Sequence, residues 1–373
     1  MNQTKKKIAI LGASYLQKSL VEKAIDMGLE THVFAWDNDE AVCKNIANFF
    51  YPISVLEKKE IYEVCKGVNI DAITTIATDI CVPTISFVSE KLGLISNSYL
   101  TALNCTNKAK MREVFFENEV KSPKYIVKTN NDIVKINLNY PVIVKPTDRS
   151  GSRGVCKVNK ETDLKKTINR GLLESIEKKV IIEEYVEGDE VSVEAISWKG
   201  QHFVLAITDK VTTGPPYFVE LEHHQPSQLN KEIQEKITRN VLKALDALNV
   251  EYGASHSEFK ITPSGDVFII EVGARMGGDF IGSHLVELST GYDYLKAVIN
   301  ISLGKFNMPT NLANNFAGVY FLSKETEYLM PHFLKDNFFD LEKKVIRKEL
   351  KNIANSNDRS GYLIYKNSNK INL

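Results

Sequence analysis

The chain has 373 residues, enough for about two or three packed units, and its 47 lysines and arginines balance its 47 aspartates and glutamates. A net charge of zero argues against a nucleic acid or an anionic membrane as partner. The five cysteines are scattered and form no CxxC pair, which is typical of thiols in a reducing compartment, so we expect a cytoplasmic protein.

The chain opens with an apolar run too short for the core of a signal peptide, and no stretch approaches the roughly 20 apolar residues of a membrane span. Instead, the N-terminal part alternates between strand-like and helix-like segments, as in "KKIAILGAS" and "IDAITTIATD". This alternation predicts an α/β unit with a parallel sheet. Its first turn holds one glycine, Gly12, where a dinucleotide site would need GxGxxG, so we expect no nicotinamide or flavin. Asp79 ends a strand and either contacts a substrate or caps a helix.

From residue 101 the pattern changes to α+β. We expect one helix over 101–119, a series of strands with one helix among them, and a long helix over 229–249. Two further strands follow, "YGASHSEFKI" and "DVFIIEV", joined by the turn "TPSGD". The tail contributes short strands such as "AGVYFL" and "GYLIYK". Segments that we expect as loops shaping a pocket are 79–83, 209–227 and 277–284.

Lys145 ends the apolar run "YPVIVK", and a polar loop follows that comprises Ser150, Gly151, Ser152, Arg153 and Gly154. A phosphate chain needs backbone N–H groups that can come close, which glycine permits, and a lysine as a point charge. A hairpin turn beside an exposed lysine fits the same residues. The chain has no GxxxxGK[ST] motif, so this is not a Walker loop.

Acidic residues crowd the strand pair "VIIEEYVEGDEVSVEAI", namely Glu183, Glu184, Glu187, Asp189 and Glu190. Like charges at this density repel one another unless a cation or a hydroxyl-rich group lies among them. One carboxylate could accept both hydroxyls of a ribose while the extended backbone binds an adenine. Acidic loops between strands are, however, usually only solvated.

Glu258 and Glu271 belong to the two strands joined by the tight turn. In such a hairpin the two carboxylates can lie side by side, which raises one pKa unless a cation bridges them. Mg²⁺ prefers carboxylate oxygens and usually completes its shell with nucleotide phosphates and water. The alternative is two surface acids that pair with lysines.

In their order and spacing these motifs resemble the ATP-grasp superfamily of carboxylate ligases, over nearly the whole chain. The tail segment "NDRSGYLIY" is similar to the closing segment of the biotin carboxylase and purine ligase branch, and within that branch the chain looks most like L-amino-acid ligases. The resemblance implies an ATP-grasp fold, α/β and α+β, with three parts. These are a Rossmann-like pre-ATP-grasp domain over 1–105, an ATP-grasp domain over 106–305 with a lid at about 112–190, and a small β-rich C-terminal segment over 306–373.

The resemblance also implies roles for individual residues around ATP. Lys108 and Lys145 match two lysines that contact the phosphates, and the loop that closes over the phosphates matches Ser150, Gly151, Ser152 and Gly154. Glu183 opens a hinge in which the backbone of Tyr185 and Val186 would bind adenine. Glu190 matches the residue that binds the ribose hydroxyls.

At the reacting end, Glu258 and Glu271 match the ligands of one or two Mg²⁺ ions, for which Mn²⁺ could substitute. Arg275 matches an arginine that faces the transferred phosphoryl and acyl groups. The substrate segment "PPYFVELEHH" places Glu220 where it could hold an amine and His223 where it could stabilise an oxyanion. Both histidines of that segment could instead be surface residues.

Gly277 and Gly278 would let the chain turn closely past the substrate into a helix that begins near Ile281. Many relatives have an asparagine at the position of Gly273, so one ligand of a second Mg²⁺ is missing here or replaced by water. The phosphate loop is less glycine-rich than in some relatives, which leaves the role of Arg153 open.

The expected activity is ATP-dependent joining of a carboxylate to an amine through an acyl phosphate, with release of ADP. The substrates would be small molecules such as amino acids, and a homodimer is compatible with the sequence. The alternatives are an ATP-grasp enzyme that uses another acid or nucleophile, such as formate, bicarbonate or a sugar-linked acid, and a non-catalytic nucleotide-binding protein.

Overall fold

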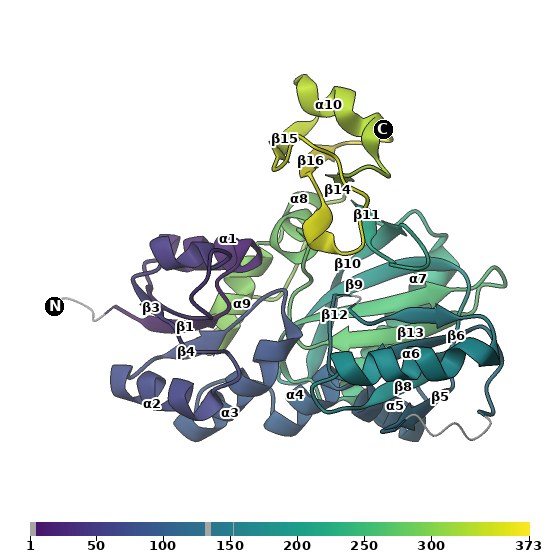
Figure 1. Cartoon of the computed structure of the whole chain (residues 1–373). Coiled ribbons are helices and arrows are strands. Elements are labelled where there is room, and N and C mark those ends of the chain that lie inside the picture. Colours follow the sequence, from purple (N-terminus) through teal and green to yellow (C-terminus); the bar gives the residue numbers. More distant parts are fainter. Residues whose placement is uncertain (1–4, 131–135, 152) are drawn as a thin grey trace.

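The computed structural model describes residues 5–130, 136–151 and 153–373, and in this part of the chain the strands form three sheets (Figure 1). The first sheet is parallel, with the order β3-β2-β1-β4. Its strands are β1 (Lys7–Leu11), β2 (Glu30–Phe34), β3 (Phe49–Tyr51) and β4 (Ala72–Thr74). The helices of this unit are α1 (Tyr15–Asp26), α2 (Lys58–Val68) and α3 (Val82–Leu92). The α/β unit expected from the alternating pattern is thereby confirmed.

The second sheet has eight strands in the order β13-β12-β9-β10-β11-β14-β16-β15. The central strands are β9 (Asp189–Trp198), β10 (Gln201–Thr212), β11 (Glu220–Gln225), β12 (Tyr252–Ile261) and β13 (Val267–Gly273). The late strands β14 (Phe316–Leu322), β15 (Asp340–Val345) and β16 (Gly361–Asn367) continue the same sheet. In Figure 1 the C-terminal part, with α10 (Met330–Leu334), projects from the rest of the molecule.

The third sheet is antiparallel, with the order β5-β8-β6-β7. Its strands are β5 (Tyr125–Lys128), β6 (Val142–Pro146), β7 (Cys156–Val158) and β8 (Val180–Glu184). Helix α6 (Glu161–Glu174) packs on it, and Figure 1 shows this layer beside the large sheet. Leu164 and Ile168, one turn apart on α6, fill the small core between them.

Helix α7 (Lys231–Ala247) covers one face of the large sheet and confirms the helix expected over 229–249. Its fully buried Ile237, Val241, Ala244 and Leu245 recur at helical spacing and pack on the strands. Burying a side chain of this size stabilises the fold by about 1.5–3 kcal/mol, so this stripe anchors the strands that line the site.

The single helix expected over 101–119 is two helices, α4 (Tyr99–Thr106) and α5 (Lys108–Glu117). Between them Asn107 has extended backbone angles, φ −98° and ψ 114°, and its side chain accepts hydrogen bonds from the N–H groups of Ala109 and Lys110. The asparagine is an N-cap that starts a new helix, which a pattern of apolar residues does not reveal.

The loop expected over 209–227 was wrong for most of its length, because β10 and β11 occupy much of it. The polar residues Lys210 and Glu220 hid the strand pattern, since they line a cavity where apolar residues would normally mark a strand. The helix expected near Ile281 is confirmed, as a π-helical turn over Ile281–Leu285 followed by α8 (Val286–Thr290).

The remaining helices are α9 (Tyr294–Ser302), which packs against α1 and β4, and short 3₁₀ turns at Val42–Asn45, Asp79–Cys81, Glu327–Leu329 and Ser356–Asp358. Within the described ranges, none of the helices has the length and apolar character needed to cross a membrane.

Candidate functional site

Two cavities adjoin in the described part of the chain, and both are bounded by the large sheet. The larger, of about 690 Å³, extends between this sheet and the N-terminal unit. The smaller, of about 180 Å³, lies between the large sheet and the third sheet. We call the residues that line both cavities the junction: Asp79, Ser150, Gly151, Lys210, Glu220, His256, Glu258 and Arg275.

Glu258 and Glu271 are direct partners in the register of β12 and β13, which confirms that they lie side by side. Each is held by a lysine: Lys210 Nζ is 2.7 Å from Glu258 Oε1, and Lys108 Nζ is 2.8 Å from Glu271 Oε1. Burial raises the pKa of Glu258, but Lys210 and the neighbouring His256 outweigh this effect and hold the pKa well below its usual range. Glu258 is therefore ready to act as an anionic ligand.

The two glutamates fit a magnesium site by their chemistry. Among the described residues no group of three or more histidine, cysteine or acidic side chains is arranged to hold a metal ion. Mg²⁺, however, is commonly bound by one or two carboxylates and takes its other ligands from phosphates and water. Glu258 and Glu271 both line the smaller cavity, so a nucleotide bound there could supply the missing oxygens.

Glu183 lies at the centre of a buried charge cluster at the base of the smaller cavity. Its carboxylate is 2.7 Å from Lys145 Nζ and 2.8 Å from Arg112 Nε. Burial alone would raise the pKa of Glu183, but the two cations lower it. Lys145 is thus a buried, paired lysine and not the exposed one of the hairpin alternative, and Arg112 was not foreseen from the sequence.

The segment after β8 forms one wall of the smaller cavity, where Tyr185 and Val186 follow Glu183 and Glu184. Glu190, at the start of β9, lines the same cavity but is already bound by two lysines, Lys210 at 2.8 Å and Lys260 at 3.1 Å. A hydroxyl-bearing ligand at Glu190 would therefore bind to a carboxylate whose charge is partly neutralised.

The glycine-containing loop lies at the entrance of both cavities, through Ser150 and Gly151. Gly154 lines neither cavity and packs against Pro146, where an added Cβ would lie 2.9 Å from the ring. Arg153 lines the larger cavity, and its Nε donates to Ser150 O at 3.2 Å. Ser152 lies outside the described residues.

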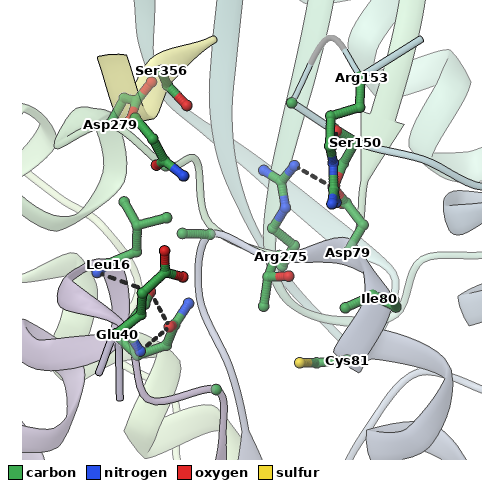
Figure 2. Close-up of a pocket in the computed structure, with 18 of the residues that line it drawn as sticks. Leu16, Glu40, Asp79, Ile80, Cys81, Ser150, Arg153, Arg275, Asp279 and Ser356 are labelled. Atoms are coloured by element: carbon green, nitrogen blue, oxygen red, sulfur yellow. Dashed lines mark hydrogen bonds and ion pairs between the residues drawn. The ribbon is translucent and has the colours of Figure 1, made fainter. Parts of the chain in front are cut away.

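Arg275 follows β13 and points toward the N-terminal unit, where its guanidinium forms an ion pair with Asp79 (Figure 2). The Nη2 atom lies 2.7 Å from Asp79 Oδ2. Burial lowers the pKa of Arg275, but the ion pair outweighs it and the net shift is upward. The N-cap of the short helical turn Asp79–Cys81 is Thr78 and not Asp79, so the helix-cap interpretation of Asp79 was wrong.

The two glycines after Arg275 have different surroundings. Gly278 lines the larger cavity. Gly277 lines neither cavity, and its N–H donates to Glu194 Oε2 at 3.0 Å. The carboxylate of Glu194 also binds His256, and this contact raises the His256 pKa to about 9 although burial acts in the opposite direction.

Glu220 on β11 is held by Arg359, whose Nη2 lies 3.2 Å from Glu220 Oε2 and whose Nη1 lies 2.9 Å from Asp279 Oδ2. His223 lies three residues further along the strand and is buried, so it is not a surface residue. Neither of its ring nitrogens has a hydrogen-bond partner among the described residues, and burial holds its pKa well below the usual value. It lines the larger cavity as a neutral imidazole.

Lys210 and Arg359 are the main site residues that the sequence did not indicate. Lys210 contacts three acids, Glu190, Glu220 and Glu258, at 2.8, 3.7 and 2.7 Å, which raises its pKa despite burial. Its signal was the run of strand-forming residues in "VLAITDKVT", which indicates a strand once Lys210 is allowed to face a cavity.

Comparison with known proteins agrees with this geometry. The family model described as "ATP-grasp domain" matches residues 138–283. Alanine–anticapsin ligase of Bacillus subtilis (strain 168) is 29% identical over 287 residues, which is 67% of this chain and 60% of that protein. D-alanine–D-alanine ligase of Flavobacterium psychrophilum is 29% identical over 192 residues, covering 48% of this chain and 57% of that protein.

Among solved structures, an L-amino acid ligase from Bacillus licheniformis superposes with a TM-score of 0.83 at 21% identity, covering 99% of this chain and 95% of that chain. The chain spans about 60% of the length of the first curated relatives that it matches. Residues 138–283 therefore match an ATP-grasp domain, and the chain shares its fold along nearly its whole length with a solved L-amino acid ligase.

Proposed function

We propose that the chain is an ATP-dependent ligase that activates a carboxylate as an acyl phosphate, with release of ADP, and joins it to an amine. The observation that carries this proposal is the junction, where a small cavity walled by lysines and acids opens into a larger one beside Arg275. The relatives named above include ligases of amino acids, which supports an amino acid or a similar small molecule as substrate.

In this proposal ATP occupies the smaller cavity as a substrate. The backbone of Tyr185 and Val186 would hold the adenine, and Glu190 the ribose. Lys108 and Lys145 would face the phosphates beneath the loop that contains Ser150 and Gly151. Glu258 and Glu271 would hold one or two Mg²⁺ ions, or Mn²⁺, beside the same phosphates. A bound Mg²⁺ would offset the negative charge of the phosphates and of the transferring group.

The protein's own part in the reaction is positioning and charge neutralisation, because a carboxylate must first attack the γ-phosphoryl to become electrophilic. Arg275 is permanently charged and can donate two parallel hydrogen bonds to the oxygens of the transferring group. His223 is a neutral imidazole without a hydrogen-bond partner within the described ranges, and it can donate one N–H to an oxygen of the acyl group. Glu220 can accept from the amine that displaces phosphate.

An acyl phosphate hydrolyses in water, so the site needs a cover. The proposed lid is the third sheet with its flanking segments, at about 112–190, because it already forms one side of the smaller cavity and carries the loop at the entrance. The boundaries at residues 105 and 305 remain predictions. We propose small-molecule partners and a cytoplasmic location; a homodimer also remains a prediction.

The proposal is tested by incubating the chain with ATP, Mg²⁺ and pairs drawn from a panel of amino acids and other carboxylates, against a panel of amines. Release of ADP and phosphate and a product mass equal to the two substrates minus water are expected for at least one pair. Turnover with formate or bicarbonate alone would favour the other-acid alternative. Nucleotide binding without ADP release under any condition would favour a non-catalytic binding protein.

A further inference from the structure

Gly273 is a glycine for reasons of space and not of backbone conformation. Its φ angle is not among the positive values of this chain, so an L-residue could adopt its backbone. A Cβ atom at this position, however, would lie 2.5 Å from Asp79 Oδ1 and 3.2 Å from Arg275 Cζ. At a contact under 3.0 Å something must shift, and the atoms that a Cβ would meet are the ends of the Asp79 and Arg275 side chains, so we expect a larger residue to displace this pair.

The loop that carries Asp79 is fixed against the Arg275 segment by its backbone as well. The N–H of Ala77 donates to Met276 O at 3.0 Å, which joins the N-terminal unit to the residue after Arg275. Ala77 itself has a φ of 63°, an uncommon conformation for a residue with a side chain. Asp79 is therefore brought to Arg275 by three features together: the strained Ala77, its backbone hydrogen bond to Met276, and the lack of a side chain at Gly273.

The pair keeps free hydrogen-bonding capacity at the junction. Asp79 is 6% exposed, and among the described residues its Oδ1 atom and the Nε atom of Arg275 have no hydrogen-bond partners. Both side chains line both cavities. An ion pair formed for stability alone would be expected to satisfy these buried atoms within the protein.

We infer that Asp79 is a positioning residue that orients the Arg275 guanidinium toward the reacting oxygens, and that Gly273 provides the room for this contact. The inference rests on the proposed function and deepens it. Because Asp79 belongs to the N-terminal unit and Arg275 to the large sheet, the orientation of the arginine depends on how these two units meet. Residue 273 then serves the arginine and not a metal ion, which accounts for the absence of an oxygen ligand at that position.

The test is a double-mutant cycle in the full-length chain with ATP, Mg²⁺ and the best substrate pair. Asp79→Asn keeps the shape of the side chain but removes its charge. Gly273→Ala displaces the ion pair without changing the identity of Asp79 or Arg275. Each variant should lower kcat by about 100-fold, the cost of misplacing a catalytic group by about 1 Å, with little change in the KM for ATP.

In an Arg275→Ala background the same two changes should have almost no further effect, because both act through the arginine. The control is Gly67→Ala, an exposed position in α2 where an added Cβ meets nothing within 4 Å, and its kcat should equal that of the wild-type chain. Thermal unfolding checks each variant. If Asp79→Asn does not fold, the Gly273→Ala arm decides alone, since it leaves the charges unchanged.

The inference would be overturned if Asp79→Asn lowered kcat further in the Arg275→Ala background. It would also be overturned if Asp79→Asn raised only the KM for the amine, since Asp79 would then contact a substrate directly. Absence of ADP release by the wild-type chain with every pair would overturn the proposed function and this inference together. If the wild-type chain is active but the free-energy costs of Asp79→Asn and Arg275→Ala add in the double variant, only this inference is overturned.

Discussion

Glu258 and Glu271 each have a lysine ammonium where a metal ion would lie, at 2.7 and 2.8 Å. A bound cation would release Lys210 and Lys108 from these contacts and leave both free to face anionic oxygens of a substrate. Two lysines beside two carboxylates thus keep the charge of the site balanced in the absence of ligands.

Glu271→Gln should weaken binding of Mn²⁺, followed by electron paramagnetic resonance in the presence of ADP, and should lower kcat by about 100-fold, or about 2.7 kcal/mol. The reason is that an amide oxygen neutralises no metal charge. Glu235→Gln, on the exposed face of α7, is the control and should change neither quantity. Normal metal affinity and normal turnover in the Glu271 variant would contradict the metal site and mean that Glu258 and Glu271 only form ion pairs with lysines.

Arg275→Lys should lower kcat by about 100-fold with little change in the KM for ATP, because the lysine keeps the charge but loses the two-pronged donor geometry. Steady-state kinetics of ADP release measure both constants, with the exposed Arg239→Lys as control. A variant that kept its kcat but melted several degrees lower would mean that Arg275 only pairs with Asp79 for stability.

At the scale of elements, the residues that line a cavity were harder to predict than the helices and strands that carry them. The helix α7 and the strands β12 and β13 were predictable because their apolar residues recur at a regular period. Roles for Lys108, Lys145, Glu258 and Glu271 could be predicted because their motifs occur in a known order, and these roles remain predictions. Lys210 and Arg359 could not, because their partners come from distant strands, and such contacts are set by the tertiary fold.

Asn107 illustrates a local signal with a consequence for the site, since it caps the helix that begins with Lys108. Asn107→Ala should reduce the free energy of unfolding by about 1 kcal/mol and raise the KM for ATP, because two N–H groups of the first turn lose their acceptor. Urea denaturation measures the first effect. Asn118→Ala, exposed at the other end of α5, is the control, and an equal loss of stability there would contradict the capping role.

At the scale of the whole molecule, the titration of buried histidines predicts acid sensitivity. Burial lowers the pKa of five histidines below the usual value, namely His32, His202, His223, His224 and His284. His256, whose pKa is raised to about 9, acts in the opposite direction, but these five histidines outnumber it. The unfolded chain therefore binds more protons than the folded chain as the pH falls through about 6.5, so stability present above this pH is lost below it.

The melting temperature should accordingly fall between about pH 7.5 and about pH 5.5, before the carboxylates titrate. His223→Gln should reduce this slope, because His223 is buried and neither ring nitrogen has a hydrogen-bond partner in the part of the chain that the structure describes. Differential scanning calorimetry across this range measures it. A melting temperature that rises on acidification would contradict the assignment of neutral buried histidines.

In the proposed function, the three sheets and the two adjoining cavities serve one chemical step, the transfer of a phosphoryl group to a carboxylate oxygen. That step is followed most directly with a carboxylate substrate labelled with ¹⁸O. The proposed mechanism predicts one ¹⁸O atom in phosphate for each ADP and each ligated product formed. Release of AMP and pyrophosphate, or phosphate without label during product formation, would contradict it.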